Sequence, residues 1–527
     1  MTAKCMGGNM KSISNAVHSL LALTMSLALP PAASAAQNVC LSEDTPAYEL
    51  AEKSLAAAQL LIASRPGRVV EQNIAAAGDR SNELRDLLRR RDRLRADAGR
   101  SEANPLEVDA SLANIEESIE QLAPGLLADL VNEPRSARAL QAALASDQGL
   151  LLYVSAPEHS YAWYLDSDCL AWTKLTDFGS AAATPVIDDL RRAITPSVAI
   201  RGERPAPAQD ARENAPAYPR EIAESLHRKL LGPFAERLAD KREIMLHASG
   251  EILSIPFSAL IDPATGQFEI ENRVYALLPS LRALDAGAVR PATGRDFPIL
   301  AIGAPGDGNS PELEWLGPLD GARAELESLG RRYPSRTIIL DGPQATKTAL
   351  SHNLDHAKGG LLLFATHALS TGLGESAVTG LLLSAEDGGE GNLDGDNAGP
   401  QLLTPLDISR LEIASDLVVL SACDTWAGPG HHAGEALTGL ALAFFEAGAT
   451  NMIVTHWPIA DQSAAVWSEY LVAQLSKSSL TSTEAIRASQ IALLRDPSGR
   501  WDHPRHWAPF VPVIGMTTSR TQEVAIR

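Results

Sequence analysis

Two short apolar runs, each leading to a potentially reactive side chain, constrain this chain more than any other feature. Residues 361–365 lead through Thr366 to His367, and residues 417–420 lead through Ser421 and Ala422 to Cys423. Short apolar runs bounded by small or polar residues are typical of strands buried on both faces, as in parallel sheets. Ligands of open α/β sheets bind at the carboxyl ends of the strands. If these two strands are neighbours, about 5 Å apart, an imidazole and a thiol flank one crevice, as a cysteine nucleophile with a general base requires.

Similar apolar runs recur along the second half of the chain and alternate with stretches of helical periodicity. The other runs are 244–247, 299–302, 337–340, 452–455 and 510–514. This alternation predicts a largely parallel sheet with helices on both faces, which is a three-layer α/β sandwich.

The order and spacing of the two reactive residues are also informative. The histidine comes first, and 56 positions separate it from the cysteine. Papain-like enzymes have the opposite order, whereas caspases place the histidine about 50 residues upstream of the cysteine. Eight short segments around and beyond these two residues make the comparison more specific. They are FATH (364–367), LVVLSACDT (417–425), GEAL (434–437), AGA (447–449), WP (457–458), PFSAL (256–260), LPSL (278–281) and WAPF (507–510).

Together these segments closely resemble the CHAT domain, a family of caspase-like cysteine peptidases in the group that also holds separase and the gingipains. The resemblance covers roughly residues 216 to 516. It implies a caspase-like fold and cleavage of protein substrates by a Cys-His dyad. Cys423 would be the nucleophile and His367 the general base and acid. The backbone amides of Cys423 and Ala368 would form the oxyanion hole.

The chain departs from the family pattern at two positions near the dyad. The family usually has glycine after the histidine, where this chain has Ala368, and often has glycine where this chain has Trp426. Alanine retains the amide donor but disfavours a positive φ. The alternative interpretation is therefore a catalytically degenerate CHAT domain that serves as a protein-interaction scaffold.

Three further residues are candidates for binding the substrate. Asp461 follows the WP segment, and an acidic pocket there would suit Arg or Lys before the scissile bond, as in separase and the gingipains. Asp424 lies next to the nucleophile, and His456 is expected at the rim of the crevice. A solvated or helix-capping role is the alternative for both aspartates.

The chain is expected to divide into four parts: residues 1–36, a signal peptide; 37–145, a helical adaptor; 146–215, a small segment with strands at 150–155 and 161–165 and a linker; and 216–527, the CHAT domain.

Within the adaptor, helices are predicted at 47–62 and 70–98, and a third helix starts at Pro105. Its apolar positions form a coiled-coil-like seam suited to a protein partner. Simple packing between helical hairpins fits that seam equally well. The seam residues are Val108, Leu112, Ile115, Ile119 and Leu122.

The first 36 residues have the features of a secretory signal. Lys4 and Lys11 precede the apolar stretch 16–29, and a small-residue stretch at 33–36 suits signal peptidase. We therefore expect export to a bacterial periplasm or the extracellular space; a buried or disordered apolar leader is the alternative. No other stretch reaches the roughly 18 apolar residues that span a bilayer.

Cysteine usage is consistent with export. Without the leader, Cys40, Cys169 and Cys423 remain, and an odd number in an exported protein indicates one unpaired thiol. The economical hypothesis is a Cys40–Cys169 disulfide that leaves Cys423 free to react. Three free thiols are the alternative.

Charge and motifs exclude other functional classes. The net charge of −20 and the pI near 5.1 argue against nucleic acid as a main partner, because phosphate binding requires a basic surface. No Gly-x-Ser-x-Gly elbow, phosphate loop or dinucleotide motif is present. His431 and His432, together with the dyad residues, lack the paired spacing of zinc sites. The sequence thus predicts no cofactor and no metal.

Overall fold

A computed structural model describes most of the chain after residue 39. The described residues are 40–62, 105–122, 134–194, 217–284, 296–305, 319–371, 378–386, 401–421, 439–457, 459, 461–477 and 480–515, with helical positions at 87, 90, 91 and 94. The predictions for the leader, for most of the helix at 70–98 and for the linker lie outside these residues. No helix in the described part is both long and apolar enough to cross a membrane.

Within the described residues, eleven strands form one sheet in the order β3-β2-β1-β4-β5-β14-β13-β12-β8-β6-β7. The strands are β1 Gln148–Ser155, β2 Ser160–Leu165, β3 Leu170–Leu175, β4 Glu243–Ala248, β5 Val274–Leu277, β6 Ile299–Pro305, β7 Thr337–Gly342, β8 Leu361–Ala365, β12 Leu417–Leu420, β13 Asn451–Thr455 and β14 Phe510–Ile514.

The sheet is mostly parallel. Seven neighbouring pairs run parallel: β1 with β4, β4 with β5, β5 with β14, β13 with β12, β12 with β8, β8 with β6, and β6 with β7. The antiparallel pairs are β1–β2, β2–β3 and β13–β14. Because β1 pairs with β4, the strands of the 146–215 segment extend the sheet of the C-terminal half.

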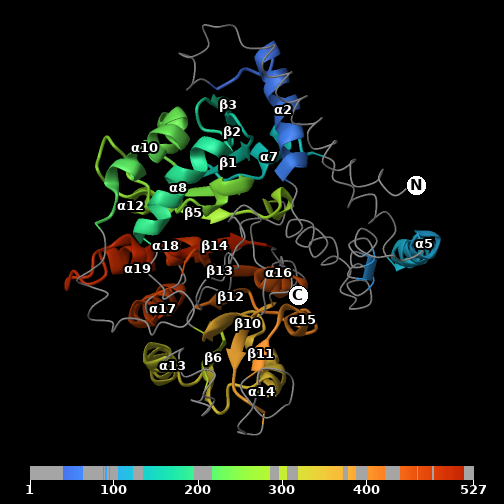
Figure 1. The fold of residues 1–527 in the computed structure, drawn as a ribbon, viewed down its shortest axis with the longest axis vertical. Coiled ribbons are helices and arrows are strands. Elements are labelled where there is room, and N and C mark those ends of the chain that lie inside the picture. The colour runs from blue at the N-terminus through green and yellow to red at the C-terminus, as the bar shows by residue number, and fades with distance from the viewer. Residues whose placement is uncertain are drawn as a thin grey trace, which may run out of the picture.

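Helices cover both faces of this sheet (Figure 1). On one face lie α8, α10, α12, α13, α17, α18 and α19; on the other lie α2, α7, α14, α15 and α16. Their bounds are α2 Pro46–Ile62, α7 Ala137–Ala142, α8 Ser180–Ile194, α10 Arg220–Leu230, α12 Glu269–Asn272, α13 Asp320–Arg332, α14 Lys347–Asn353, α15 Pro405–Ile408, α16 Gly439–Glu446, α17 Asp461–Leu475, α18 Ser482–Leu494 and α19 Pro504–Trp507. The predicted three-layer α/β sandwich is confirmed.

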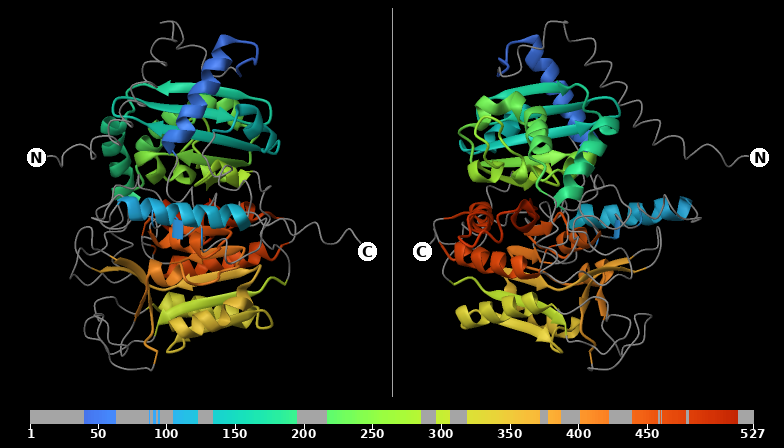
Figure 2. Two further views of the ribbon diagram at one scale, coloured as in Figure 1. Left: turned by 90° about the vertical axis from the view of Figure 1, so that its right-hand side faces the viewer. Right: turned by 60° about the vertical axis from the view of Figure 1, so that its left-hand side comes forward.

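The N-terminal helices begin where their sequence signals predict. Helix α2 starts at Pro46, after Thr45, and its buried face crosses strands β1–β3 (Figure 2). A disulfide joins Cys40, just before this helix, to Cys169 at the start of β3. This is the pairing that the cysteine count favoured. Helix α5 (Pro105–Leu122) has Ile119 fully buried, while the coiled-coil seam stays a prediction.

Aromatic side chains hold the central strands between the helical layers. Phe364 of β8 packs edge-on against Phe444 of α16, with ring centroids 5.3 Å apart. On the opposite face, Trp467 of α17 stacks on Phe510 of β14 at 3.5 Å. These large buried surfaces supply the hydrophobic stabilisation of the layers and position the strand ends.

A second, small sheet begins directly after β8. In the described part of the chain it has three antiparallel strands in the order β11-β10-β9: β9 Ala368–Thr371, β10 Val378–Leu383 and β11 Gln401–Leu403. Neither this sheet nor β3 and β5 was predicted. Strands β5, β9 and β11 have only three or four residues, and β3 and β10 contain polar residues or glycine that interrupt the apolar runs on which the sequence-based assignment depended.

Candidate active site

The two strands that lead to the proposed dyad are neighbours, as expected. Strands β8 and β12 pair in parallel, with Leu361 opposite Leu417 and Phe364 opposite Leu420. Every residue of β12 thus lies opposite the residue 56 positions earlier, and 56 positions also separate His367 from Cys423. Cys423 itself lies outside the described residues, which on β12 end at Ser421. The register of β8 and β12 thus has the same interval of 56 residues that separates His367 from Cys423 in the sequence.

Backbone hydrogen bonds fix the segment that carries the imidazole. Beyond the paired strands, the Ser421 N–H donates to the carbonyl of Phe364 at 2.9 Å, so the two strand ends remain together. On the other side, Leu382 of β10 donates its N–H to the His367 carbonyl at 2.9 Å. The buried Thr366 hydroxyl donates to the Leu382 carbonyl at 2.6 Å. His367 is half-buried and lies where the chain passes from the large sheet to the small one.

Strand pairing also orients the amide of Ala368. Residues of an antiparallel pair alternate between hydrogen-bonded and non-hydrogen-bonded positions. His367 and Leu382 are hydrogen-bonded, so Ala368 and its partner Leu381 occupy the next, non-hydrogen-bonded position. The Ala368 N–H consequently points away from β10. This orientation is the one that an oxyanion donor beside His367 would need.

A glycine allows the neighbouring strand to approach the end of β8. Gly303 of β6 lies opposite Ala365, and a Cβ atom at this position would be 1.9 Å from the Ala365 carbonyl oxygen. That separation is far below van der Waals contact, so only glycine fits. The backbone two residues before His367 is thus held tightly from the β6 side.

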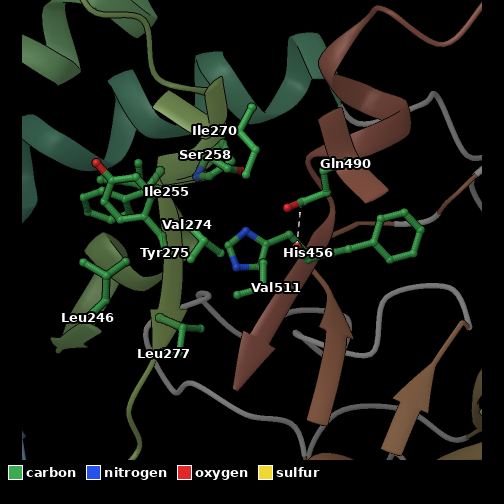
Figure 3. A pocket seen from close by; sticks show the side chains of 13 residues that line it. Leu246, Ile255, Ser258, Ile270, Val274, Tyr275, Leu277, His456, Gln490 and Val511 are labelled. Carbon is green, nitrogen blue, oxygen red and sulfur yellow. Dashed lines mark hydrogen bonds between the residues drawn. The ribbon is translucent and has the colours of Figure 1, made fainter. Parts of the chain in front are cut away.

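His456 occupies a different environment from the one expected. It is 2% exposed and lines a small cavity among apolar side chains of β4, β5 and β14 (Figure 3). Burial, and then the charge of Arg191, lower the pKa of its imidazole well below the ordinary value. The expectation that His456 lies at the rim of the crevice was therefore wrong. Its ring, at the end of β13, is buried in the interior and is not exposed to solvent.

A side chain of α8 forms hydrogen bonds with the backbone at His456. Arg191 of α8 donates to the carbonyls of Ser254, at 3.1 Å, and of His456, at 3.0 Å. The indole N–H of Trp457 donates to the Arg505 carbonyl at 3.1 Å. These hydrogen bonds stabilise the segment that follows β13. Strand β13 lies next to β12, on the side away from β8.

The remaining substrate-binding candidates are only partly placed. Asp461 is the first residue of α17, so it lies close to the carboxyl end of β13. Asp424 and Trp426 lie outside the described residues. Thr366, Leu382, Gly303 and Arg191 support the site but were not singled out from sequence, although Thr366 and Gly303 lie at the ends of predicted strands.

No group of three or more potential metal ligands occurs among the described side chains. The described part of the site contains the imidazole of His367, the Ala368 amide that points away from β10, and strand β12, which precedes Cys423 in the sequence. A mostly parallel sheet with helices on both faces and a histidine at the carboxyl end of a central strand defines a three-layer α/β domain with a candidate site at the strand ends.

Comparison with known proteins gives the family. The CHAT domain model matches residues 220–515, more than half of the chain. The chain belongs to the CHAT domain family.

Other similarities are more distant. The mouse protein "Tetratricopeptide repeat protein 28" is 24% identical over 310 residues, covering 51% of this chain; the chain spans only 12% of that protein's length. A Saccharomyces cerevisiae separase–securin complex is 10% identical with a TM-score of 0.47, covering 97% of this chain and 41% of that one. The Arg-specific cysteine proteinase gingipain R is 12% identical with a TM-score of 0.31, covering 71% and 78%.

Proposed function

We propose that this protein is a cysteine endopeptidase in which Cys423 is the nucleophile and His367 the general base and acid. The observation that carries the proposal is the shared interval of 56 residues: it separates every paired position of β8 and β12, and it also separates the imidazole from the thiol. The family membership supports the same assignment.

The chemistry follows from the residue types. A free thiol has a pKa near 8.5 and is mostly protonated at neutral pH, so an adjacent imidazole must accept its proton or stabilise the thiolate. The sulfur then attacks the scissile carbonyl carbon, and the oxyanion is stabilised by the amides of Cys423 and Ala368. The C–N bond breaks as His367 protonates the leaving amine. Water, deprotonated by His367, hydrolyses the thioester and restores the thiol.

Two aspartates that are close in sequence to the ends of β12 and β13 favour a basic residue before the scissile bond. Asp461 begins α17 just after β13, and Asp424 follows the nucleophile in sequence. A carboxylate in a partly desolvated pocket binds a guanidinium or ammonium group strongly. We therefore propose protein or peptide substrates with Arg or Lys at this position.

A non-catalytic scaffold of the same fold is the second candidate. Ala368 in place of glycine, and Trp426 near the nucleophile, are the observations that favour it. In this case the N-terminal helices, including the α5 seam, would hold a protein partner and the crevice would bind without cleaving.

Peptide cleavage distinguishes the two. Cleavage of an Arg- and Lys-containing peptide library is measured for the unmodified protein, Cys423→Ala and His367→Gln, with the exposed His352→Gln as the matched control. We expect cleavage by the unmodified protein and His352→Gln and at least a hundredfold loss in the dyad variants, because each supplies an obligatory group. Equal cleavage by Cys423→Ala and the unmodified protein would reject the peptidase.

The same proposal places the protein outside the cytoplasm, in a periplasm or the extracellular medium, after removal of residues 1–36. A disulfide between Cys40 and Cys169 is compatible with an oxidising compartment. Mass spectrometry of the protein expressed in a bacterial host with its leader should find a mature N-terminus near residue 37. An intact N-terminus in the cytoplasmic fraction would contradict export.

A further inference from the structure

Strand β9 has an open edge that begins at the proposed oxyanion donor. It is the outer strand of the small sheet, and none of the described strands pairs with its outer side. Ala368 and Ser370 lie opposite Leu381 and Thr379, the non-hydrogen-bonded positions of the β9–β10 pair. The N–H and C=O groups of these two residues therefore point outward. They form a row of main-chain donors and acceptors that another strand can use.

The contacts of β10 indicate which way this edge faces. The end of β10 lies beside the loop after β7, because Ser384 donates its N–H to the Ala345 carbonyl at 2.8 Å and its hydroxyl to the Gly342 carbonyl at 2.6 Å. Strands β6 and β7 flank β8 on one side and β12 flanks it on the other. With β10 on the β6 and β7 side, the outer edge of β9 faces away from them, where β12 ends.

We propose that the outer edge of β9 binds the main chain of the substrate on the leaving-group side of the scissile bond, by strand addition. This inference rests on the proposed peptidase function. Asp461, which follows β13, is the proposed partner of the residue before the bond, and β13 and β8 lie on opposite sides of β12. A substrate that starts near Asp461 and crosses the end of β12 reaches β9 with the residues that follow the bond.

Strand geometry then specifies which substrate groups are bound. In a parallel pair, the N–H of a residue donates to the carbonyl of the residue that precedes its opposite partner. The carbonyl of the same residue accepts the N–H of the residue that follows that partner. If the Ala368 N–H holds the scissile carbonyl, the Ala368 carbonyl accepts the N–H of the second residue after the bond. The Ser370 N–H then donates to the carbonyl of that same residue, whereas the N–H of the third residue points away. Recognition here depends on an extended main chain and not on side-chain identity.

N-methylated peptides test this register on the unmodified protein. The probe is the best-cleaved peptide of the Arg- and Lys-containing library, synthesised with four residues after the bond. One version is N-methylated at the second residue after the bond, and the matched control at the third. We expect kcat/KM to fall about tenfold or more for the first version, since a hydrogen bond is lost and an acceptor blocked, and to change less than threefold for the second.

A variant of the strand tests the same contact from the protein side. Ser370→Pro removes an outward N–H that the β9–β10 ladder does not use, and proline is tolerated on edge strands. The measurement is the ratio of kcat/KM for the extended peptide to that for a truncated peptide whose aminocoumarin leaving group replaces all residues after the bond. The reference is the same ratio for Ser370→Ala, which retains the N–H. We expect Ser370→Pro to lower this ratio about tenfold.

The possible outcomes distinguish strand addition on β9 from the peptidase function itself. Loss confined to second-position methylation, together with a lower ratio for Ser370→Pro, supports strand addition on β9. Cleavage that is equally fast with both methylated peptides, or equally slow, overturns the inference but leaves the peptidase in place. An unmodified protein that cleaves no library peptide overturns the proposed function and the inference with it. If Ser370→Pro does not fold, the methylated peptides still decide the question.

Discussion

Ser421 donates its backbone N–H to the Phe364 carbonyl at 2.9 Å, one residue beyond the last paired position of β12. This bond shows that the two strands remain together at their carboxyl ends, where a separation of even a few ångströms would part a nucleophile from its base. The proposed dyad therefore depends on the register of two strands that are distant in sequence.

Replacing Thr366 by valine should loosen the junction between the two sheets. The change is nearly isosteric but removes the hydroxyl bonded to the Leu382 carbonyl at 2.6 Å, leaving a buried acceptor without that donor. We expect the free energy of unfolding to fall by about 1–2 kcal/mol and peptide cleavage to fall about tenfold as His367 loses its support. Denaturant titration and kinetics measure both, with the exposed Thr348→Val as the control. An unchanged unfolding midpoint would show that the hydroxyl does not support the junction.

Gly303→Ala should be strongly destabilising. The added methyl group would be 1.9 Å from the Ala365 carbonyl oxygen, which is backbone and has little freedom to move. Overpacking of this kind lowers the free energy of unfolding by about 3 kcal/mol. At Gly232, the nearest atom to an added Cβ is 3.9 Å away, so Gly232→Ala is the matched control. Similar urea midpoints for the two variants would mean that β6 shifts freely.

Arg191→Ala should destabilise the segment that follows β13. Its guanidinium donates to the carbonyls of Ser254 and His456, which belong to segments far apart in sequence. Charged hydrogen bonds of this kind contribute about 1.5–3 kcal/mol, so we expect a loss within that range. The neighbouring Arg192 is solvent-exposed and forms an ion pair with the exposed Asp189, which makes Arg192→Ala a suitable control. Thermal denaturation of both variants measures the difference, and equal melting temperatures would contradict a fastening role.

Stability should fall as the pH drops below about 6.5. His247 is buried and bonded through Nδ1 to the Leu278 carbonyl, and burial lowers the pKa of its imidazole from 6.5 to about 4. Between these values the unfolded chain binds a proton that the folded chain does not. The contribution is therefore fully present above pH 6.5 and is lost progressively toward pH 4, by about 1.4 kcal/mol per pH unit for one such group.

The pH prediction is tested by comparing unfolding free energies of the unmodified protein and His247→Asn between pH 7 and pH 5. Asparagine can retain a donor for the Leu278 carbonyl but does not titrate, so the variant should lose less stability on acidification. His456, whose pKa is lowered in the same direction, remains in both proteins and contributes equally. Parallel pH profiles would show that His247 does not contribute.

Much of the fold could be predicted from local patterns. The apolar runs at β4, β6, β7, β8, β12, β13 and β14 were long enough to identify the strands, and their alternation with helices indicated a parallel sheet. Short strands escaped prediction because three or four residues carry too little periodicity, as with β5 and β9. His456 was misplaced because adjacency to a strand end does not reveal which side of the sheet a side chain enters.

The sequence by itself determined which longer segments become strands and which family the chain resembles, because both depend on residue type and local order. It gave the Cys40–Cys169 disulfide only as a hypothesis, which the structure confirmed. Only the tertiary structure decided that β8 and β12 are neighbours with a register of 56, that Gly303 approaches Ala365, and that no described strand pairs with the outer edge of β9 beside His367. The first two of these relationships join residues that are tens of positions apart. They arise from the packing of whole layers, which no local pattern encodes.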